Sequence, residues 1–355
     1  MFKRLLSLTS AFVLLFCLVS CKKGYESVPS SEQELTTVMK MGDFEIKYEL
    51  FRTFFLTNKS SIDGGDRNVW ISDKASEYRA EAMELILPQI AEIYAMFAMC
   101  ESYGIEVFSE EMDAKVQQYV DVSVDGGMIG DSIISGFASY EEYLEYLKSM
   151  YMNDSVSRLL IRYSVCEELL REKFLSEAKA TKEDVEEFFF GDECAHITWL
   201  NILYEGTEYL GSEDMRNLAD KAHARLKTAK NQREVINTLV QYSAGASASQ
   251  IENGFYIGKY TLDSAYMQEI IDAAFTLKAG EFSDVIENYY GLYIIYVMNK
   301  NASYLETKSN YEEIEELYLN NKFYYALSEY KASLLKSVKY TDFFNSLNFA
   351  EIEYK

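Results

Sequence analysis

The stretch over residues 193–301 constrains the fold of this chain most, because the order of its elements follows from the sequence alone. It opens with an apolar run that carries an early histidine, His196. Two segments with helical periodicity follow, then a short strand between Gly254 and Gly258, then a helix that ends in Lys-Ala-Gly-Glu at 278–281. A final apolar strand closes the stretch, which predicts a domain of the order strand, two helices, strand, helix, strand.

The segment before this stretch, residues 36–190, is predicted to be mostly α-helical. A small hairpin comes first, because a Gly-Asp turn at 42–43 separates two short apolar runs. Apolar residues then recur at helical spacing over 73–103, where Pro88 is expected to break or kink the run. The glycine-rich residues 126–136 are expected to form a mobile loop. Further helices are expected where a side chain can cap free backbone donors, at Ser109, Ser139 and Thr181.

After the same stretch, the chain is predicted to return to the helical region. Ser309 and Glu312 have the spacing of a capping box, which favours a helix that reaches about Ser337. The last residues alternate between apolar and acidic side chains over 350–354, a pattern typical of a short half-buried strand. A helix and a strand of this kind need an apolar partner, and the amino-terminal hairpin and helices are the available one.

The amino terminus has the pattern of an export signal. Lys3 and Arg4 precede an apolar run over 5–19 that is too short for a stable membrane span. Its end, Leu-Val-Ser-Cys, is similar to a bacterial lipobox, which predicts a diacylglycerol group on Cys21. The alternative is an ordinary secretory signal with an incidental cysteine. Residues 22–36 are polar and contain a proline, so a flexible tether is expected there.

Charge and cysteine content exclude several classes of function. The chain has 57 acidic and 34 basic residues, which disfavours binding to nucleic acid or to anionic lipid through a basic face. Three cysteines remain after Cys21, and this odd number argues against a disulfide framework. Cys194 and His196 lie close together, but two histidines in the whole chain do not supply a tetrahedral metal site. No metal and no cofactor is therefore expected.

The order of these elements resembles the SurA and PrsA type of extracytoplasmic foldase, which carries a parvulin-like peptidyl-prolyl isomerase domain. The best motifs outside 193–301 are Met-Gly-Asp-Phe-Glu-Ile at 41–46 and the helix entry at 181–190. The resemblance implies an α+β fold, in which a mostly helical chaperone domain contains an inserted parvulin-like domain with a small antiparallel sheet. The implied parts are a signal peptide at 1–21, a tether at 22–36, a helical domain at 37–190, the parvulin-like domain at 192–301 and a returning segment at 303–355.

Parvulins are similar to one another in placing two histidines, a Cys or Asp, and a Ser or Thr around an apolar shelf for proline. Here His196 matches the first histidine, and Tyr293 stands in the place of the second, within Gly-Leu-Tyr-Ile at 291–294. Tyr290 replaces the Ser or Thr, and the Cys or Asp position falls on Ala244 or Gly245. The residues that match the shelf are Ile257, Met267 (or its neighbour Tyr266) and Ile270.

Two interpretations of the domain remain open at this point. Either His196 holds the sheet interior through buried hydrogen bonds with Tyr293 and the domain only binds peptides, or the shelf and the Tyr293 hydroxyl support weak isomerisation. His223 is expected to be a solvent-facing bystander. The resemblance implies a lipid-anchored, ATP-independent chaperone for exported polypeptides on the extracytoplasmic face of the bacterial envelope. An active prolyl isomerase and a surface lipoprotein that binds other ligands are the alternatives, and the sequence leaves the oligomeric state open.

Overall fold

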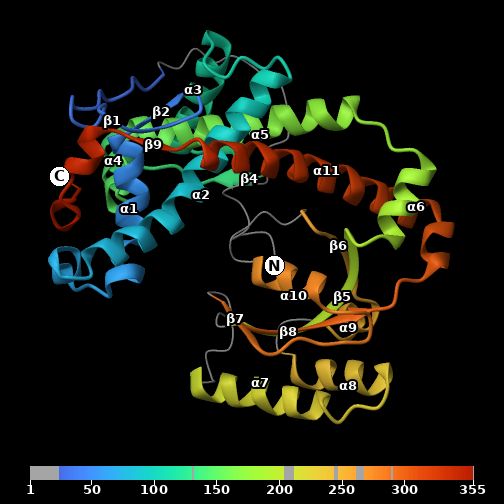
Figure 1. Ribbon diagram of the computed structural model, residues 1–355. Helices are drawn as coiled ribbons and strands as arrows, with labels where there is room; N and C mark the ends of the chain where they lie inside the picture. Colours follow the sequence, from blue (N-terminus) through green and yellow to red (C-terminus); the bar gives the residue numbers. More distant parts are fainter. Residues whose placement is uncertain are drawn as a thin grey trace. The chain divides into compact units, whose positions relative to one another are not determined.

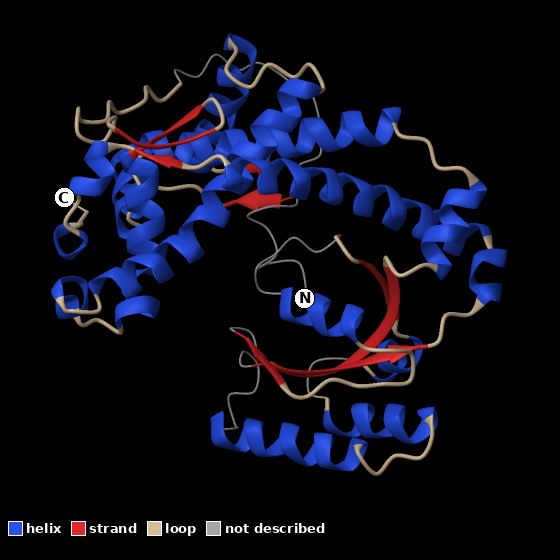
Figure 2. Cartoon of the chain, in the orientation of Figure 1, coloured by secondary structure: helices blue, strands red, loops and turns tan. Residues whose placement is uncertain are grey.

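The computed structural model of the protein describes residues 24–129, 132–203, 212–243, 247–260, 268–288 and 291–354 (Figure 1). The chain divides into two compact units. The first joins Met1–Glu177 to Ala326–Lys355, and the second is Ala178–Tyr325. Both combine helices with small antiparallel sheets (Figure 2), which confirms the predicted α+β class.

The first unit is built on a helical scaffold. The described helices of its amino-terminal part are α1 (Tyr48–Asp63), the 3-10 helix η1 (Arg67–Ile71), α2 (Ala75–Ser102), α3 (Glu110–Asp125), α4 (Tyr140–Ser149) and α5 (Asp154–Glu177). The predicted caps form: Ser109 accepts from the Met112 N–H, and Ser139 accepts from the Glu142 N–H. α2 continues through Pro88 as one helix, so of the two outcomes expected at this proline, a break or a kink, the break does not occur. This helix is long and apolar enough to cross a membrane, but 61% of its most apolar window is buried, as in a core helix.

A three-stranded antiparallel sheet joins the two ends of the chain in the first unit. Its order is β2 (Phe44–Lys47), β1 (Thr37–Met41) and β9 (Lys339–Tyr340). Beyond β9, α12 (Asp342–Ser346) and the 3-10 helix η3 (Phe349–Glu351) continue over the helices. The aromatic ring of Phe349 packs between Phe51, Phe55 and Trp70, and its side chain is 2% exposed. The carboxy-terminal segment therefore completes the amino-terminal core.

Three local predictions for the first unit are wrong. The tail over 350–354 is not a strand, because the apolar side chains of Phe349 and Ile352 reach the core from a 3-10 turn and its continuation. The expected loop at 126–136 contains an antiparallel pair, β3 (Gly127–Ile129) and β4 (Ser132–Ile134). Residues 24–36, expected to be a flexible tether, hydrogen-bond to the helices: for example, Arg52 pairs with Glu34 at 2.8 Å.

The second unit contains a four-stranded antiparallel sheet with helices on both faces. Its order is β6 (Phe255–Gly258), β5 (Cys194–Leu203), β8 (Gly291–Met298) and β7 (Ile286–Asn288). α7 (Ser212–Leu226) and α8 (Gln232–Tyr242) lie on one face of this sheet, and α10 (Gln268–Thr276) lies on the other (Figures 1 and 2). A short helix, α9 (Ala248–Asn253), precedes β6. The predicted elements over 193–301 are present in their predicted order, and α9 and β7 are present in addition.

The strands of this sheet are apolar on both sides because both faces are covered. Residues 200 and 202 of β5 and the even-numbered residues of β8 pack with α7, α8 and α9. The odd-numbered residues 195 and 197 of β5, and 293, 295 and 297 of β8, pack with α10. Each strand therefore divides its side chains between two separate cores, as the alternation of a strand requires.

The second unit extends beyond the expected 192–301 at both ends. α6 (Lys182–Phe190) starts with the predicted capping box of Thr181 and Asp184, and the first part of α11 (Lys308–Lys336) packs with it. Phe189 of α6 and Ile314 of α11 are both fully buried in this small core. α11 is capped by Thr307, whose hydroxyl accepts from the Asn310 N–H, and not by Ser309 as expected. Between β8 and α11 lies the 3-10 helix η2 (Ala302–Glu306).

Candidate functional site

His196 lies in β5, and backbone oxygens of this chain meet both nitrogens of its ring. Nδ1 is 3.1 Å from the carbonyl oxygen of Asn299, and Nε2 is 2.9 Å from that of Asn253. The ring also stacks on Tyr256, with 4.3 Å between ring centroids and 14° between planes. A neutral imidazole donates from one nitrogen only, so at most one contact is an N–H···O bond unless the ring carries two protons. In either case the ring is held inside the fold.

Gly254 makes this arrangement of His196 possible. It follows α9 with φ of +63°, a left-handed conformation that favours glycine. A Cβ at this position would lie 2.6 Å from the Ile197 carbonyl oxygen and 3.0 Å from His196 Nε2. The glycine therefore lets the end of α9 approach β5 closely enough for the Asn253 carbonyl to reach the histidine.

Tyr293 and His196 lie on opposite faces of the sheet. β5 and β8 pair without interruption from His196, opposite Met298, to Leu203, opposite Gly291. In this register Tyr293 is opposite Asn201, which is five residues and about 17 Å along β5 from His196. An odd number of residues also places the two side chains on different faces. The expected hydrogen bonds between His196 and Tyr293 are therefore absent, and the carbonyls of Asn253 and Asn299 take that role.

The described residues of the expected proline shelf belong to the core between the sheet and α10. Ile257 is 4% exposed, Ile270 is 0% exposed, and both pack in the same cluster as Tyr293, which is 5% exposed. The structure thus brings three of the predicted site residues together, but as interior side chains. Met267 and its alternative Tyr266 lie outside the described residues.

Other expected positions cannot be placed with this group. Tyr290, Ala244 and Gly245 lie outside the described residues, as does the proposed lipidation site, Cys21.

His223 is not the solvent-facing bystander that the sequence suggested. Its Nε2 lies 3.2 Å from an Asp284 carboxylate oxygen, and its side chain is 15% exposed.

The thiols of the described chain are buried. Cys100, Cys166 and Cys194 are free and buried, and the Cys100 thiol donates to the Cys166 carbonyl oxygen at 3.6 Å. Burial raises the pKa of Cys194 to about 12, so its reactive thiolate form is scarce at neutral pH. Cys194 and His196 therefore do not form a nucleophile and base.

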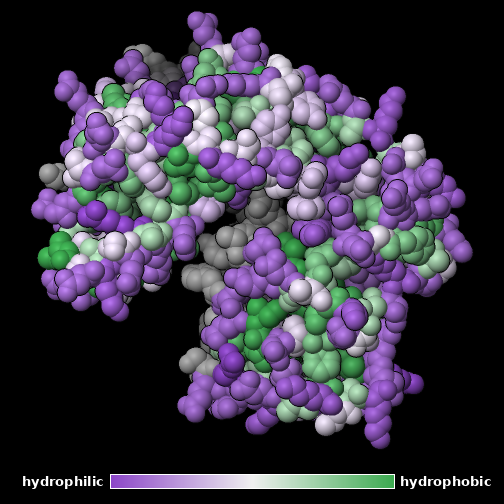
Figure 3. Space-filling view, in the orientation of Figure 1, coloured by the Kyte–Doolittle hydropathy of each residue, from purple (hydrophilic) through white to green (hydrophobic). Residues whose placement is uncertain are grey.

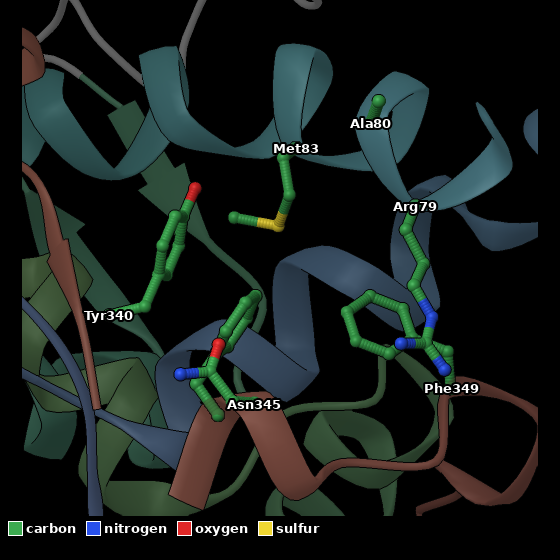
Figure 4. A pocket seen from close by; sticks show the side chains of 7 residues that line it. Arg79, Ala80, Met83, Tyr340, Asn345 and Phe349 are labelled. Carbon is green, nitrogen blue, oxygen red and sulfur yellow. The ribbon is translucent and has the colours of Figure 1, made fainter. Parts of the chain in front are cut away.

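A pocket in the first unit was not foreseen from the sequence. It has a volume of about 260 Å³, and Figure 4 shows its side chains converging from α2, β9, α12 and η3. The lining residues are Arg79, Ala80, Met83, Tyr340, Phe344, Asn345 and Phe349. The Arg79 guanidinium lies 4.9 Å from the centroid of the Phe349 ring. Aromatic rings, a methionine and one cation thus surround a space large enough for a side chain of a bound peptide.

The first unit also exposes large apolar side chains outside this pocket. Hydrophilic side chains cover much of the face seen in Figure 3, in keeping with the 91 charged residues of the chain. Against that background, several apolar side chains of the first unit are at least 44% exposed, namely Val28, Leu35, Ile71, Phe108, Met128, Ile133, Tyr146, Met150 and Tyr151.

No protein-family model and no curated protein sequence matches this chain. Among solved structures, it is similar to PrsA from Bacillus subtilis, with 19% identity, a TM-score of 0.27, and coverage of 74% of this chain and 87% of that one. It is also similar to the foldase PrsA from Streptococcus pneumoniae, with 16% identity, a TM-score of 0.33, and coverage of 89% of this chain and 98% of that one. A third similar structure is a SurA-like chaperone from Campylobacter jejuni, with 13% identity, a TM-score of 0.28, and coverage of 86% of this chain and 99% of that one. These are proteins of the type that the sequence resembles, but at such TM-scores the likeness adds no support for a particular activity.

Proposed function

We propose that this chain is an ATP-independent chaperone for exported polypeptides, and that its parvulin-like domain does not catalyse prolyl isomerisation. The pocket between α2 and the carboxy-terminal segment is the observation that carries the proposal. Three aromatic rings and a methionine line it, and such side chains adapt to varied apolar partners. A chaperone needs contacts of this kind, which retain unfolded chains without selecting one sequence.

The pocket suits a peptide side chain for reasons of size and chemistry. A volume of about 260 Å³ is below the usual range for a drug-sized ligand, roughly 300–1,000 Å³. Its cation, Arg79, stands over an aromatic ring, and no carboxylate lines the pocket. An apolar side chain of a client therefore fits inside, and a client backbone carbonyl or carboxylate can accept from the guanidinium at the rim.

The geometry of the second unit supports the absence of catalysis. A prolyl isomerase lowers a barrier of about 18–20 kcal/mol by favouring a twisted amide in a dry pocket with hydrogen-bonding groups placed around it. Here His196 is committed to two backbone carbonyls, and Ile257 and Ile270 are interior residues. We propose that this unit serves as a structural or peptide-binding module.

An acyl group on Cys21 would anchor the chaperone to the extracytoplasmic face of the envelope. The proposal follows from the lipobox-like residues before Cys21. Two or three acyl chains stabilise membrane residence by about 0.8 kcal/mol per buried methylene, enough for a lasting anchor.

An aggregation assay tests the chaperone proposal. The purified chain at stoichiometric amounts should suppress aggregation of an unfolded exported protein, without ATP. Ala80→Glu places a charged side chain in the pocket from an exposed position, and it should weaken suppression several-fold. Ser76→Glu makes the same charge change at an exposed position of the same helix outside the pocket, and should leave suppression unchanged. Full suppression by the Ala80→Glu variant would show that the pocket does not hold clients.

A refolding assay tests the absence of catalysis. Refolding limited by a prolyl bond takes tens to hundreds of seconds without a catalyst. The chain should leave that rate unchanged at catalytic concentrations. A rate increase that disappears in the His196→Ala variant would establish the isomerase alternative.

A further inference from the structure

The first two described residues, Gly24 and Tyr25, are fastened to α3. Gly24 lies against the side chain of Gln117, whose Cγ would be 3.1 Å from a Cβ at this glycine. The Tyr25 backbone N–H donates to Asp121 at 3.2 Å, and the Tyr25 hydroxyl donates to Asp125 at 2.7 Å. Gly24 and Tyr25 therefore lie against α3 between the levels of Gln117 and Asp125.

Contacts with α4 and α5 hold the same segment from the other side. The guanidinium of Arg158 donates to the Tyr25 carbonyl oxygen at 2.8 Å, and the Tyr25 ring stacks on Tyr140 at 4.8 Å. The Val28 N–H donates to Asp154, a carboxylate that is 2% exposed. Three helices thus fix the first residues of the segment.

The later part of the segment is fixed by an ion pair. Burial opposes the ionisation of Glu34, but hydrogen bonds from Ser31 and the ion pair with Arg52 outweigh it and lower the pKa of Glu34. The Arg52 side chain is 7% exposed, so the pair is largely shielded from water. Residues 24–36 are part of the folded unit along their whole length.

This fastening limits how far a lipid on Cys21 can be from the protein. Three peptide units separate Cys21 from Gly24, and three extended residues reach about 11 Å at most. An acylated Cys21 would therefore bring the flank of α3 to within about that distance of the bilayer surface. A free tether over 22–36 would have allowed several times this separation.

The exposed apolar pair of the first unit lies at the end of the same helix. Asp125 is the last residue of α3, and the β3–β4 pair follows at once. Met128 and Ile133 are directly opposite each other in this pair, so both side chains lie on one face, where they are 64% and 82% exposed. Eight residues of helix, about 12 Å, separate the level of Gln117 from that of Asp125.

We propose that Met128 and Ile133 insert into the lipid interface beside the anchor. The inference rests on the acylation of Cys21 proposed above, because a short covalent link keeps these two side chains at a high effective concentration near the bilayer. The occupant of this surface is a lipid bilayer. The contact is made by apolar side chains. The nearby carboxylates of Asp121 and Asp125 disfavour binding to anionic head groups. It therefore forms on zwitterionic lipid.

Quenching of a tryptophan by brominated lipid tests the proposal. The full mature chain is coupled through Cys21 to a maleimide phospholipid in phosphatidylcholine vesicles, which the three buried cysteines permit. Met128→Trp supplies the probe. Ile71→Trp is the matched control, because Ile71 is 67% exposed and belongs to η1, a part of the first unit that packs on α2 and η3. The native Trp70 and Trp199 are present in both samples.

Brominated acyl chains should reduce the added fluorescence of the Met128→Trp chain at least two-fold and leave that of the Ile71→Trp chain nearly unchanged. Ile133→Asp, added to the Met128→Trp chain, should abolish the quenching without changing suppression of aggregation, which reports that the chain is folded. Equal quenching at both probes, or none at Met128→Trp, would overturn the proposal. The proposal would also be overturned if added unfolded client or a higher protein concentration changed the fluorescence of the Met128→Trp probe while brominated lipid did not.

This experiment separates the new inference from the proposed function on which it rests. The lipid is attached chemically, so quenching does not depend on acylation in the cell. Mass spectrometry of the amino-terminal peptide of the native protein tests acylation of Cys21 by itself, and the aggregation assay tests the chaperone activity without any membrane.

Discussion

Replacing Ile270 by alanine distinguishes an interior residue from a proline shelf. Ile270 is 0% exposed and packs from α10 onto β5 and β8. Truncation to alanine removes three carbon groups, about 2.4 kcal/mol at about 0.8 kcal/mol for each. The cavity left behind adds to this cost, and measured Ile→Ala substitutions in cores span about 2–5 kcal/mol. We expect the second unit to lose about 3–4 kcal/mol of unfolding free energy.

The two tryptophans of the chain allow the second unit to be followed by itself. Trp199 packs in the same cluster as Ile270, whereas Trp70 is buried in the first unit. In a Trp70→Phe background, the fluorescence of Trp199 in a urea titration therefore reports the second unit. With a slope of about 1–3 kcal/mol per molar urea, the midpoint should fall by roughly 1–4 M.

Glu269→Ala is the matched control for this measurement. Glu269 is exposed on the same helix and one residue away, so its truncation should change the free energy by less than about 0.5 kcal/mol. A side chain that formed an open shelf for clients would also lose little stability on truncation. An Ile270→Ala midpoint equal to that of Glu269→Ala would therefore refute the assignment of this residue to the core.

Three further predictions follow from buried or paired groups. The pKa of Glu34 is lowered in the folded chain, so ionised Glu34 stabilises the fold above the ordinary pKa of 4.5, and this stabilisation is lost as the pH falls through the pKa of the folded state. Amide hydrogen exchange over 24–36 should therefore become faster in that acidic range, and Glu34→Gln should remove this pH dependence. Phe349→Ala should cost the first unit about 3–5 kcal/mol in urea unfolding, whereas Glu351→Ala, at an exposed position, should be nearly neutral. Cys194 should resist N-ethylmaleimide at pH 8 until urea unfolds the chain, because burial raises its pKa to about 12; rapid native labelling would contradict this.

Local patterns predicted much of the fold. The turn at Gly42, the caps at Ser109 and Thr181, and the order of elements in the second unit all depend on residues a few positions apart. The errors arose where a local pattern competed with distant contacts. The tail over 350–354 alternates like a strand, but Phe349 is drawn into a core whose rings come from α1 and η1, some 280–300 positions earlier.

At the candidate site, too, local patterns predicted some features and distant contacts decided others. A motif assigns residues to positions in a strand, and His196 and Tyr293 do occupy the two central strands of the sheet. Which face each side chain takes depends on the register between β5 and β8, and a shift by one residue would reverse it. No sequence motif specifies the register between these two strands. Likewise, the sequence shows that Ile257 and Ile270 are apolar, but not that α10 covers them.

By itself, the sequence determined the α+β class and the order of the main elements between 193 and 301. These depend on residue type and on spacing within one element. Only the tertiary structure decided that His196 and Tyr293 are apart, that an aromatic pocket forms between α2 and the carboxy-terminal segment, and that Tyr25 is fastened to α3. Each of these joins segments from 90 to 270 positions apart, and such contacts follow from how whole elements pack and not from any local pattern.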